Sequence, residues 1–171
     1  LAIVHAVRTG DWEEVVASAL DLATEFTDNG HVGKAAIVTG AGRGIGRGHA
    51  LHLAAQGAKV IVNDIDPSEA SNVVAEIVKD GGTASTNASN IASREGAQAL
   101  VAQCADEFDT VDILVNNAGN VRDRSFLKMS DEEFGDVLEV HAFGTFRCSQ
   151  EAALRMKEQG TGGSIVNTVS A

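Results

Sequence analysis

Short apolar runs and longer segments of helical periodicity alternate along most of the chain. The runs predict five strands: Ala35–Thr39, Lys59–Asn63, Thr83–Asn87, Val111–Asn116 and Ser164–Val169. Helical spacing predicts four helices: Gly44–Gln56, Pro67–Asp80, Ser93–Phe108 and Asp131–Gln159. The strands read as apolar runs rather than alternating ones, which indicates strands covered on both faces. The order predicts an α/β fold, a doubly wound parallel sheet with helices on both faces.

The first 30 residues follow a different pattern. Asp11 with Glu14 forms a helix start signal, and apolar residues then recur at helical spacing as far as Phe26. We therefore divide the chain into an N-terminal helical extension, residues 1–30, and a sheet domain, residues 31–171. The extension is either a small appendage or the tail of an upstream domain.

Local sequence signals mark the N-termini of two predicted helices. Pro67 suits the first turn of a helix, where its missing N–H costs nothing. Ser130 with Glu133 three residues later forms a capping box.

A glycine-rich loop, Thr39-Gly40-Ala41-Gly42-Arg43-Gly44-Ile45-Gly46, joins the first predicted strand to the first predicted helix. This context favours a dinucleotide site, since glycines let the backbone approach a pyrophosphate and the helix N-terminus attracts its charge. The alternative is a tight turn without a ligand.

An acidic residue, Asp64, ends the second predicted strand, 18 residues after Gly46. A carboxylate there accepts hydrogen bonds from the adenosine ribose and repels a 2′-phosphate, so it favours NAD over NADP. Arg43 points the other way, because an arginine in the loop can pair with a 2′-phosphate. We favour NAD, with Arg43 facing solvent.

Composition narrows the classes of partner. The formal net charge of −11 disfavours nucleic acid and anionic membranes as partners. The two cysteines, Cys104 and Cys148, are expected to be buried free thiols rather than a disulfide or metal pair, which suits a cytoplasmic location. No metal site is expected. No apolar run approaches the roughly 20 residues that span a bilayer, and no secretory signal is visible.

The glycine loop resembles the TGxxxGIG motif of the short-chain dehydrogenases/reductases, and Asn116-Asn117-Ala118-Gly119 resembles the NNAG motif of that family. The resemblance extends over residues 32–171. It implies a Rossmann-type sheet, here its first five strands, and a nicotinamide cofactor. It places Asn90 beside the adenine, where the family often carries an acid. The candidate cofactor-binding residues are Gly40, Arg43, Gly44, Ile45, Gly46, Asp64, Asn90, Asn117, Ala118 and Gly119.

The resemblance also implies catalytic residues. Ser170 corresponds to the serine that hydrogen-bonds the substrate oxygen. The family's proton-donating Tyr and its Lys would follow beyond Ala171, and the chain contains no tyrosine. Since carbonyl reduction needs a proton donor within reach, these 171 residues alone are expected not to turn over.

His141 stands where most members of the family place an Asn. Together with the segment after NNAG, it resembles the (3R)-hydroxyacyl-CoA dehydrogenase branch, which includes peroxisomal multifunctional enzymes. Its ring could hold a relay water, or it could be a packed helix histidine. Arg122-Asp123-Arg124 is interpreted as a solvated charge cluster rather than an acyl-CoA phosphate site.

The favoured hypothesis is an oxidoreductase that transfers a hydride between NAD and a secondary alcohol or ketone. Its substrate would be a small molecule, a 3-hydroxyacyl thioester, and the complete enzyme would form homo-oligomers. One alternative is a non-catalytic nucleotide-binding module or subunit. Another is an enzyme like the 3-oxoacyl-carrier-protein reductases.

Overall fold

A computed structural model describes residues 30–169, which form a parallel five-stranded sheet in the order β3-β2-β1-β4-β5. The strands are β1 (Ala35–Thr39), β2 (Lys59–Asn63), β3 (Thr83–Asn87), β4 (Ile113–Asn116) and β5 (Ser164–Asn167). The helices are α3 (Gly44–Ala55), α4 (Pro67–Lys79), α5 (Arg94–Phe108), the 3₁₀ turn η1 (Phe126–Lys128), α6 (Asp131–Leu138), the π-helical turn η2 (Glu139–Gly144) and α7 (Thr145–Glu158). The predicted N-terminal helix lies outside the described residues.

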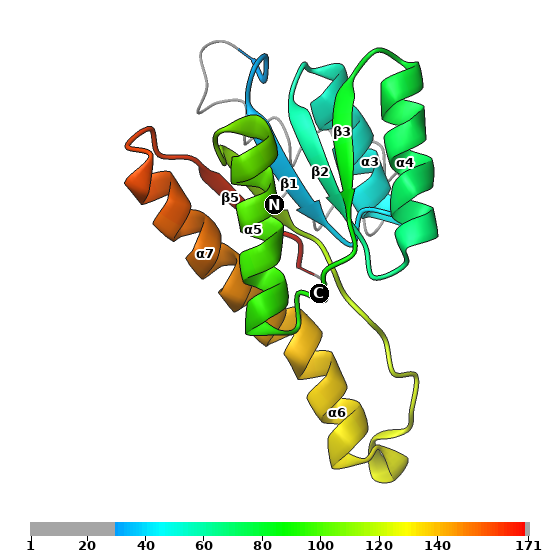
Figure 1. Cartoon of the computed structure of the whole chain (residues 1–171). Helices are drawn as coiled ribbons and strands as arrows, with labels where there is room; N and C mark the ends of the chain where they lie inside the picture. The colour runs from blue at the N-terminus through cyan, green and yellow to red at the C-terminus, as the bar shows by residue number, and fades with distance from the viewer. Residues whose placement is uncertain (1–29, 170–171) are drawn as a thin grey trace.

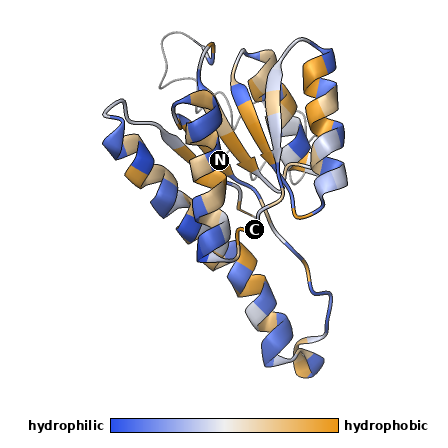
Figure 2. Cartoon of the chain, viewed as in Figure 1, coloured by the Kyte–Doolittle hydropathy of each residue, from blue (hydrophilic) through white to orange (hydrophobic). Residues whose placement is uncertain are grey.

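Helices cover both faces of the sheet (Figure 1), and a separate apolar core lies on each face. On β1, Ala36 and Val38 point into the core under α3 and α4, while Ala35 and Ile37 point into the core under α5 and α7. Successive side chains of a strand point to opposite faces, so a strand covered on both sides is apolar throughout. Figure 2 shows this as apolar central strands between helices whose outer faces are hydrophilic. The doubly wound α/β prediction is confirmed.

The edge of the sheet departs from the prediction of apolar strands. β3 carries the sequence Thr-Ala-Ser-Thr-Asn and is largely exposed or half-buried. Within residues 30–169 it pairs with β2 alone. An edge strand buries less side-chain surface, so it does not need the apolar run that central strands need.

The predicted single helix over Asp131–Gln159 is wrong as a continuous α-helix. The π-helical turn η2 separates α6 from α7, and His141 lies within this turn. Gly144, at the end of the turn, packs so closely on Ile91 that a Cβ atom would collide with it. π-helical turns inside α-helices often lie at functional sites. The capping box of Ser130 and Glu133 at the start of α6 is confirmed.

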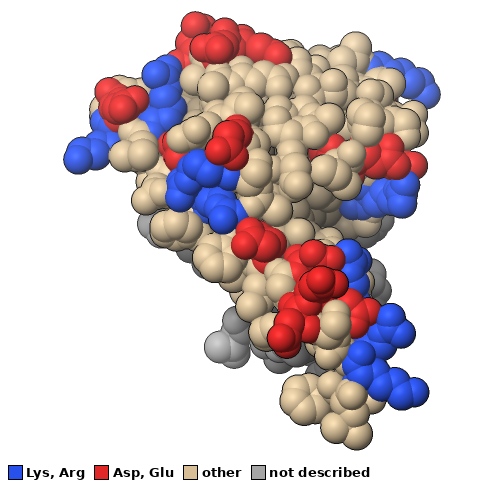
Figure 3. Space-filling model, turned by 60° about the horizontal axis from the view of Figure 1, so that its bottom comes forward, with Lys and Arg blue, Asp and Glu red and all other residues tan. Residues whose placement is uncertain are grey.

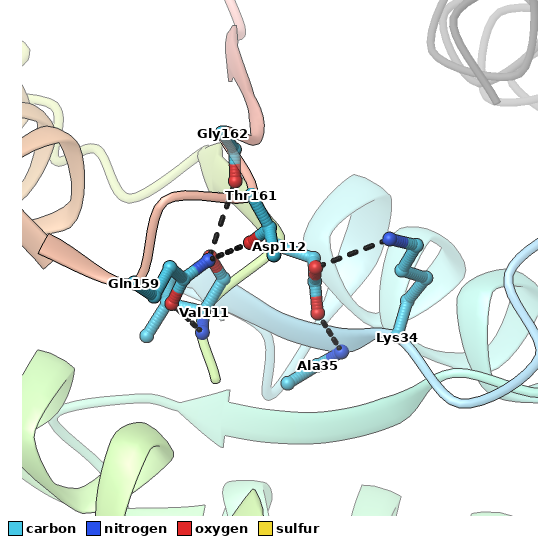
Figure 4. A network of polar contacts seen from close by, with 7 residues as sticks. All are labelled: Lys34, Ala35, Val111, Asp112, Gln159, Thr161 and Gly162. Atoms are coloured by element: carbon cyan, nitrogen blue, oxygen red, sulfur yellow. Dashed lines mark hydrogen bonds and ion pairs between the residues drawn. The ribbon is translucent and has the colours of Figure 1, made fainter. Parts of the chain in front are cut away.

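Polar side chains tie the amino ends of the strands together (Figure 4). The Asp112 carboxylate accepts from Ala35 N at 2.9 Å and pairs with Lys34 Nζ at 3.2 Å. The Gln159 side chain bonds both the N–H and the C=O of Val111, which explains why β4 begins at Ile113 rather than at the predicted Val111. With the amino edge occupied by these internal bonds, the carboxyl edge is the place to look for a ligand site.

Three features of the described part bear on the classes of protein considered above. No helix between residues 30 and 169 is long and apolar enough to cross a membrane. Within the same residues, no group of three or more His, Cys, Asp or Glu side chains is arranged to hold a metal ion. Cys104 and Cys148 are both free and buried, and burial raises the pKa of each thiol to about 12.

A buried histidine on α3 predicts acid sensitivity. His49 is only 3% exposed, and burial, followed by the charge of His52, lowers its pKa to about 4. The unfolded chain therefore takes up a proton near pH 6.5, while the folded protein resists it until about pH 4. The stability present above pH 6.5 is lost as the pH falls towards 4, by roughly 2–3 kcal/mol.

Urea unfolding at pH 7.5 and pH 5.0 checks this expectation. His49→Leu should flatten the decline in unfolding free energy between these pH values, whereas His52→Leu should keep most of it. An equally steep decline in His49→Leu would contradict the assignment to His49.

Candidate cofactor site at the carboxyl edge of the sheet

A pocket of about 810 Å³ opens at the carboxyl ends of β1, β2, β3 and β4. Its volume lies in the range typical of cofactor sites. It is lined by seven of the predicted cofactor residues: Gly40, Arg43, Asp64, Asn90, Asn117, Ala118 and Gly119. Gly44, Ile45 and Gly46 are not among its lining residues and form the first turn of α3, which follows the loop.

The two sequence motifs are joined directly by hydrogen bonds. Thr39 Oγ1 accepts from the backbone N–H groups of Asn117 and Ala118, both at 3.0 Å. Asn117 Nδ2 donates to the carbonyls of Thr39 and Gly40, both at 3.1 Å. The loop after β1 and the loop after β4 therefore form one rigid unit.

Close backbone contact requires glycine in this unit. A Cβ atom at Gly46 would collide with the Gly40 carbonyl oxygen and with Asn117 Nδ2. Gly40 has φ +60°, and a Cβ atom there would lie 2.7 Å from Ala118 Cα. Side chains at these positions would push α3 away from the loops and change the shape of the pocket.

Asp64 lies where the sequence predicts, after β2 and facing the glycine loop. Its Oδ2 accepts from Gly42 N at 2.9 Å and its Oδ1 accepts from Asp66 N at 3.0 Å. These bonds fix the orientation of the carboxylate at the wall of the pocket. Because each carboxylate oxygen has further lone pairs, Asp64 can still accept from a ligand hydroxyl.

Arg43 is not simply directed to solvent as expected. Although mostly exposed, its Nη2 lies 3.2 Å from Asp66 Oδ2 and 3.1 Å from Glu69 Oε1. The arginine of the loop is thus attached to the first turn of α4.

Asparagines at the ends of the strands form a set that the sequence reasoning missed. Asn63 donates to Asn87 Oδ1 at 2.8 Å, and Asn116 donates to Asn167 Oδ1 and to Ser149 Oγ, both at 2.9 Å. Each asparagine is the last residue of its strand. The repeated asparagine at the ends of the strands was the available signal. These side chains join neighbouring strands at the carboxyl edge of the sheet, where Asn63 lines the pocket.

His141 contacts the loop after β4. Its Nε2 lies 3.0 Å from Asn120 N and 2.8 Å from Asn120 O, so either tautomer makes one hydrogen bond there. Gly119 makes room for the imidazole, because a Cβ atom at Gly119 would lie 2.6 Å from His141 Cε1. His141 thus holds the backbone of the pocket wall. Ser170 lies outside the described residues.

The charge cluster after the NNAG motif pairs within the protein. Arg122 Nη2 lies 3.1 Å from Asp136 Oδ2, and Arg124 Nη2 lies 2.7 Å from Glu133 Oε1. Figure 3 shows acidic and basic side chains next to one another at the projecting end of the molecule, where α6 lies. These contacts agree with an exposed charge cluster.

The N-terminus of α3 suits a phosphate. Asp66, Ser93 and Ser130 cap α4, α5 and α6 with side-chain hydrogen bonds, but α3 has no side-chain cap and no acidic residue in its first turn. Its first N–H groups and positive dipole end are therefore available to an anion at the glycine loop. Together with Asp64, which follows the neighbouring strand β2, these residues fit a dinucleotide.

Comparisons with known proteins agree with this geometry. A model of the short chain dehydrogenase family matches residues 34–171. The peroxisomal multifunctional enzyme type 2 of Mus musculus is 42% identical over 81% of this chain and 20% of its own length. A 3-oxoacyl-[acyl-carrier-protein] reductase of Synechocystis is 41% identical over 79% of this chain and 55% of its own length.

A solved structure shares the fold. A 7α-hydroxysteroid dehydrogenase complexed with NADH and 7-oxo glycochenodeoxycholic acid has a TM-score of 0.77 and 39% identity, covering 82% of this chain and 55% of that one. This chain therefore spans about a fifth to a half of the length of the relatives it matches. The sequence motifs, the sheet order and the matched residues together show that the chain belongs to the short-chain dehydrogenase family.

Proposed function

We propose that this chain forms the cofactor-binding part of an NAD-dependent oxidoreductase. The main support for the proposal is that three predicted parts of the site lie around the same pocket. The glycine loop, the loop after β4 and Asp64 meet around one cavity of about 810 Å³ at the carboxyl edge. Ligands of open α/β sheets bind at this edge, where the strand order reverses.

Each part of the pocket has a separate task in this proposal. The N–H groups at the start of α3 bind the pyrophosphate, and Asp64 accepts from the ribose hydroxyls. Asn117 and Thr39 fix the wall next to the cofactor, and Asn90, which lines the pocket, would lie beside the adenine. The bound nicotinamide supplies the hydride, while the protein binds and orients the reacting groups.

The catalytic assignments rest on the family. Ser170 would hydrogen-bond the substrate oxygen. His141 would act as a positioning residue through Asn120, and its Nδ1, which makes no hydrogen bond within residues 30–169, would be available to a relay water. Since the sequence holds no tyrosine, we expect the 171 residues alone to bind cofactor without turning over.

For the substrate we propose a 3-hydroxyacyl thioester or its 3-oxo counterpart. Relatives named as peroxisomal multifunctional enzymes and as 3-oxoacyl-[acyl-carrier-protein] reductases support this class. The similarity to a 3-oxoacyl-[acyl-carrier-protein] reductase supports, as the alternative, a reductase that acts on carrier-protein thioesters. Assays of the complete enzyme with a coenzyme A thioester and with a carrier-protein thioester separate the two. If the complete protein binds the cofactor but turns over neither thioester, a non-catalytic nucleotide-binding module would be favoured instead.

Three further expectations belong to this proposal. The division into a helical extension, residues 1–30, and a cofactor domain, residues 31–171, stays a prediction. Homo-oligomers of the complete enzyme are supported by the exposed apolar side chains Phe134, Phe146 and Leu154 along α6 and α7. The cytoplasmic location also stays a prediction, since several relatives are named as peroxisomal.

Cofactor titration tests the proposal. NADH should bind more tightly than NADPH, because a 2′-phosphate would face the Asp64 carboxylate. In Asp64→Ala, the ratio of the NADPH Kd to the NADH Kd should fall roughly tenfold. Calorimetric titration of both cofactors measures the two affinities. Equal binding of NADH and NADPH by the unchanged protein would contradict the role given to Asp64.

A further inference from the structure

The loop arginine and the first turn of α4 form a charge cluster beside Asp64. Arg43 contacts two carboxylates, Asp66 and Glu69, and Asp64 lies next to them at the end of β2. The following inference rests on the proposed function, because it concerns the end of the pocket that would hold the adenosine.

Tight packing places these groups within reach of one another. A Cβ atom at Gly42 would lie 2.7 Å from both Asp64 Oδ2 and Glu69 Cβ. The absence of a side chain at Gly42 thus lets the glycine loop approach α4. This close approach brings the guanidinium of the next residue, Arg43, to the carboxylate of Glu69.

The second carboxylate is fixed by the helix that it caps. Asp66 Oδ1 accepts from Ser68 N at 3.0 Å and from Ser68 Oγ at 2.6 Å, which leaves Oδ2 to face Arg43. The Ser68 side chain is the main cause that holds the pKa of Asp66 below its ordinary value. Arg43 is therefore paired with an ionised, oriented group and not only with a mobile surface side chain.

We propose that Asp66 and Glu69 set the cofactor preference together with Asp64, by occupying the Arg43 guanidinium that would otherwise bind a 2′-phosphate. The presence of Arg43 in the glycine loop then does not indicate a preference for NADP in this protein.

The charges around the pocket support this role. Its lining contains two arginines, Arg43 and Arg122, and four carboxylates, Asp64, Asp66, Asp136 and Glu139. Arg122 already pairs with Asp136. A 2′-phosphate carries a charge of about −1.5 to −2. Asp66 and Glu69 both contact Nη2 of Arg43, so a 2′-phosphate would have to share the guanidinium with two carboxylates while remaining close to the carboxylate of Asp64.

Removing the partners should release the arginine. A free guanidinium forms charge-assisted, bidentate bonds to phosphate. In Glu69→Gln, the ratio of the NADPH Kd to the NADH Kd should therefore fall several-fold, and in Asp66→Asn/Glu69→Gln roughly tenfold or more. The asparagine keeps an oxygen to cap Ser68 N, so α4 should remain intact. Circular dichroism checks that the variants fold.

Two controls separate pairing from net charge. Glu76→Gln removes one negative charge from the same helix, but Glu76 pairs with Arg47, so the ratio of the two Kd values should not change. Adding Arg43→Met to the double variant should reverse most of the gain in NADPH binding, because the released guanidinium is then missing.

Direct titration with NADH and NADPH, independent of turnover, gives the result. An unchanged ratio in the double variant, with NADH still bound, would overturn this inference and leave the proposed function standing. A fall in the ratio that persists after Arg43→Met would also overturn it, since simple repulsion by the carboxylates would then be the cause. Failure of the unchanged protein to bind either cofactor would overturn both proposals.

Discussion

Replacing Gly46 with valine should weaken NADH binding by roughly a hundredfold. The valine Cβ would occupy the space of the Gly40 carbonyl oxygen and of Asn117 Nδ2. Relief requires the first turn of α3 to move away from the loop, which misplaces the N–H groups proposed to hold the pyrophosphate. Overpacking of this kind costs about 1–3 kcal/mol, so we expect the Kd to rise by roughly a hundredfold.

Gly135→Val is the matched control for this substitution. Gly135 also lies in a helix, α6, but a Cβ atom there meets no other atom within 4 Å. Calorimetric titration of both variants with NADH should show a loss only in Gly46→Val. Unchanged binding in Gly46→Val would mean that the glycine loop is only a turn.

The central strands were predictable because burial on both faces leaves a direct trace in the sequence. β1 and β2 begin and end at the predicted residues, and nearly every position in them is buried. β4 begins two residues later than predicted, since the Gln159 side chain takes the backbone bonds of Val111. A contact between residues 48 positions apart leaves no periodic signal near the strand.

The interruption between α6 and α7 was not predictable from periodicity. The polar and apolar positions from Asp131 to Gln159 fit one helix, and no proline marks a break. Packing of Gly144 on Ile91, which comes from a distant part of the chain, accompanies the π-helical turn. Local sequence patterns do not contain such tertiary contacts.

The candidate site shows the same division between local and distant information. The glycine loop, Asp64 and the NNAG motif are local signals, and they do meet at one pocket. The pairing of Arg43 with Glu69 was not visible, because it depends on how closely α4 packs on the loop. The sequence identified the glycine and polar residues of the site. Which charged side chains pair with one another could be seen only in the folded structure.

The second large effect is expected at Asn117, which joins the two motifs. Its Nδ2 donates to two backbone carbonyls, those of Thr39 and Gly40, in a partly buried position. In Asn117→Ala both carbonyls lose their donor, and the free energy of unfolding should fall by about 2–3 kcal/mol. Since the glycine loop is then held less firmly, NADH binding should weaken as well.

Asn72→Ala is the control for that variant, because Asn72 is exposed on α4 and its replacement should leave stability and binding nearly unchanged. Urea unfolding and NADH titration of the two variants give the comparison. The combination of results matters here. A loss of stability without weaker NADH binding would mean that Asn117 braces the sheet but does not shape the pocket. A loss of both would tie the rigidity of the joined loops to their capacity to bind a dinucleotide.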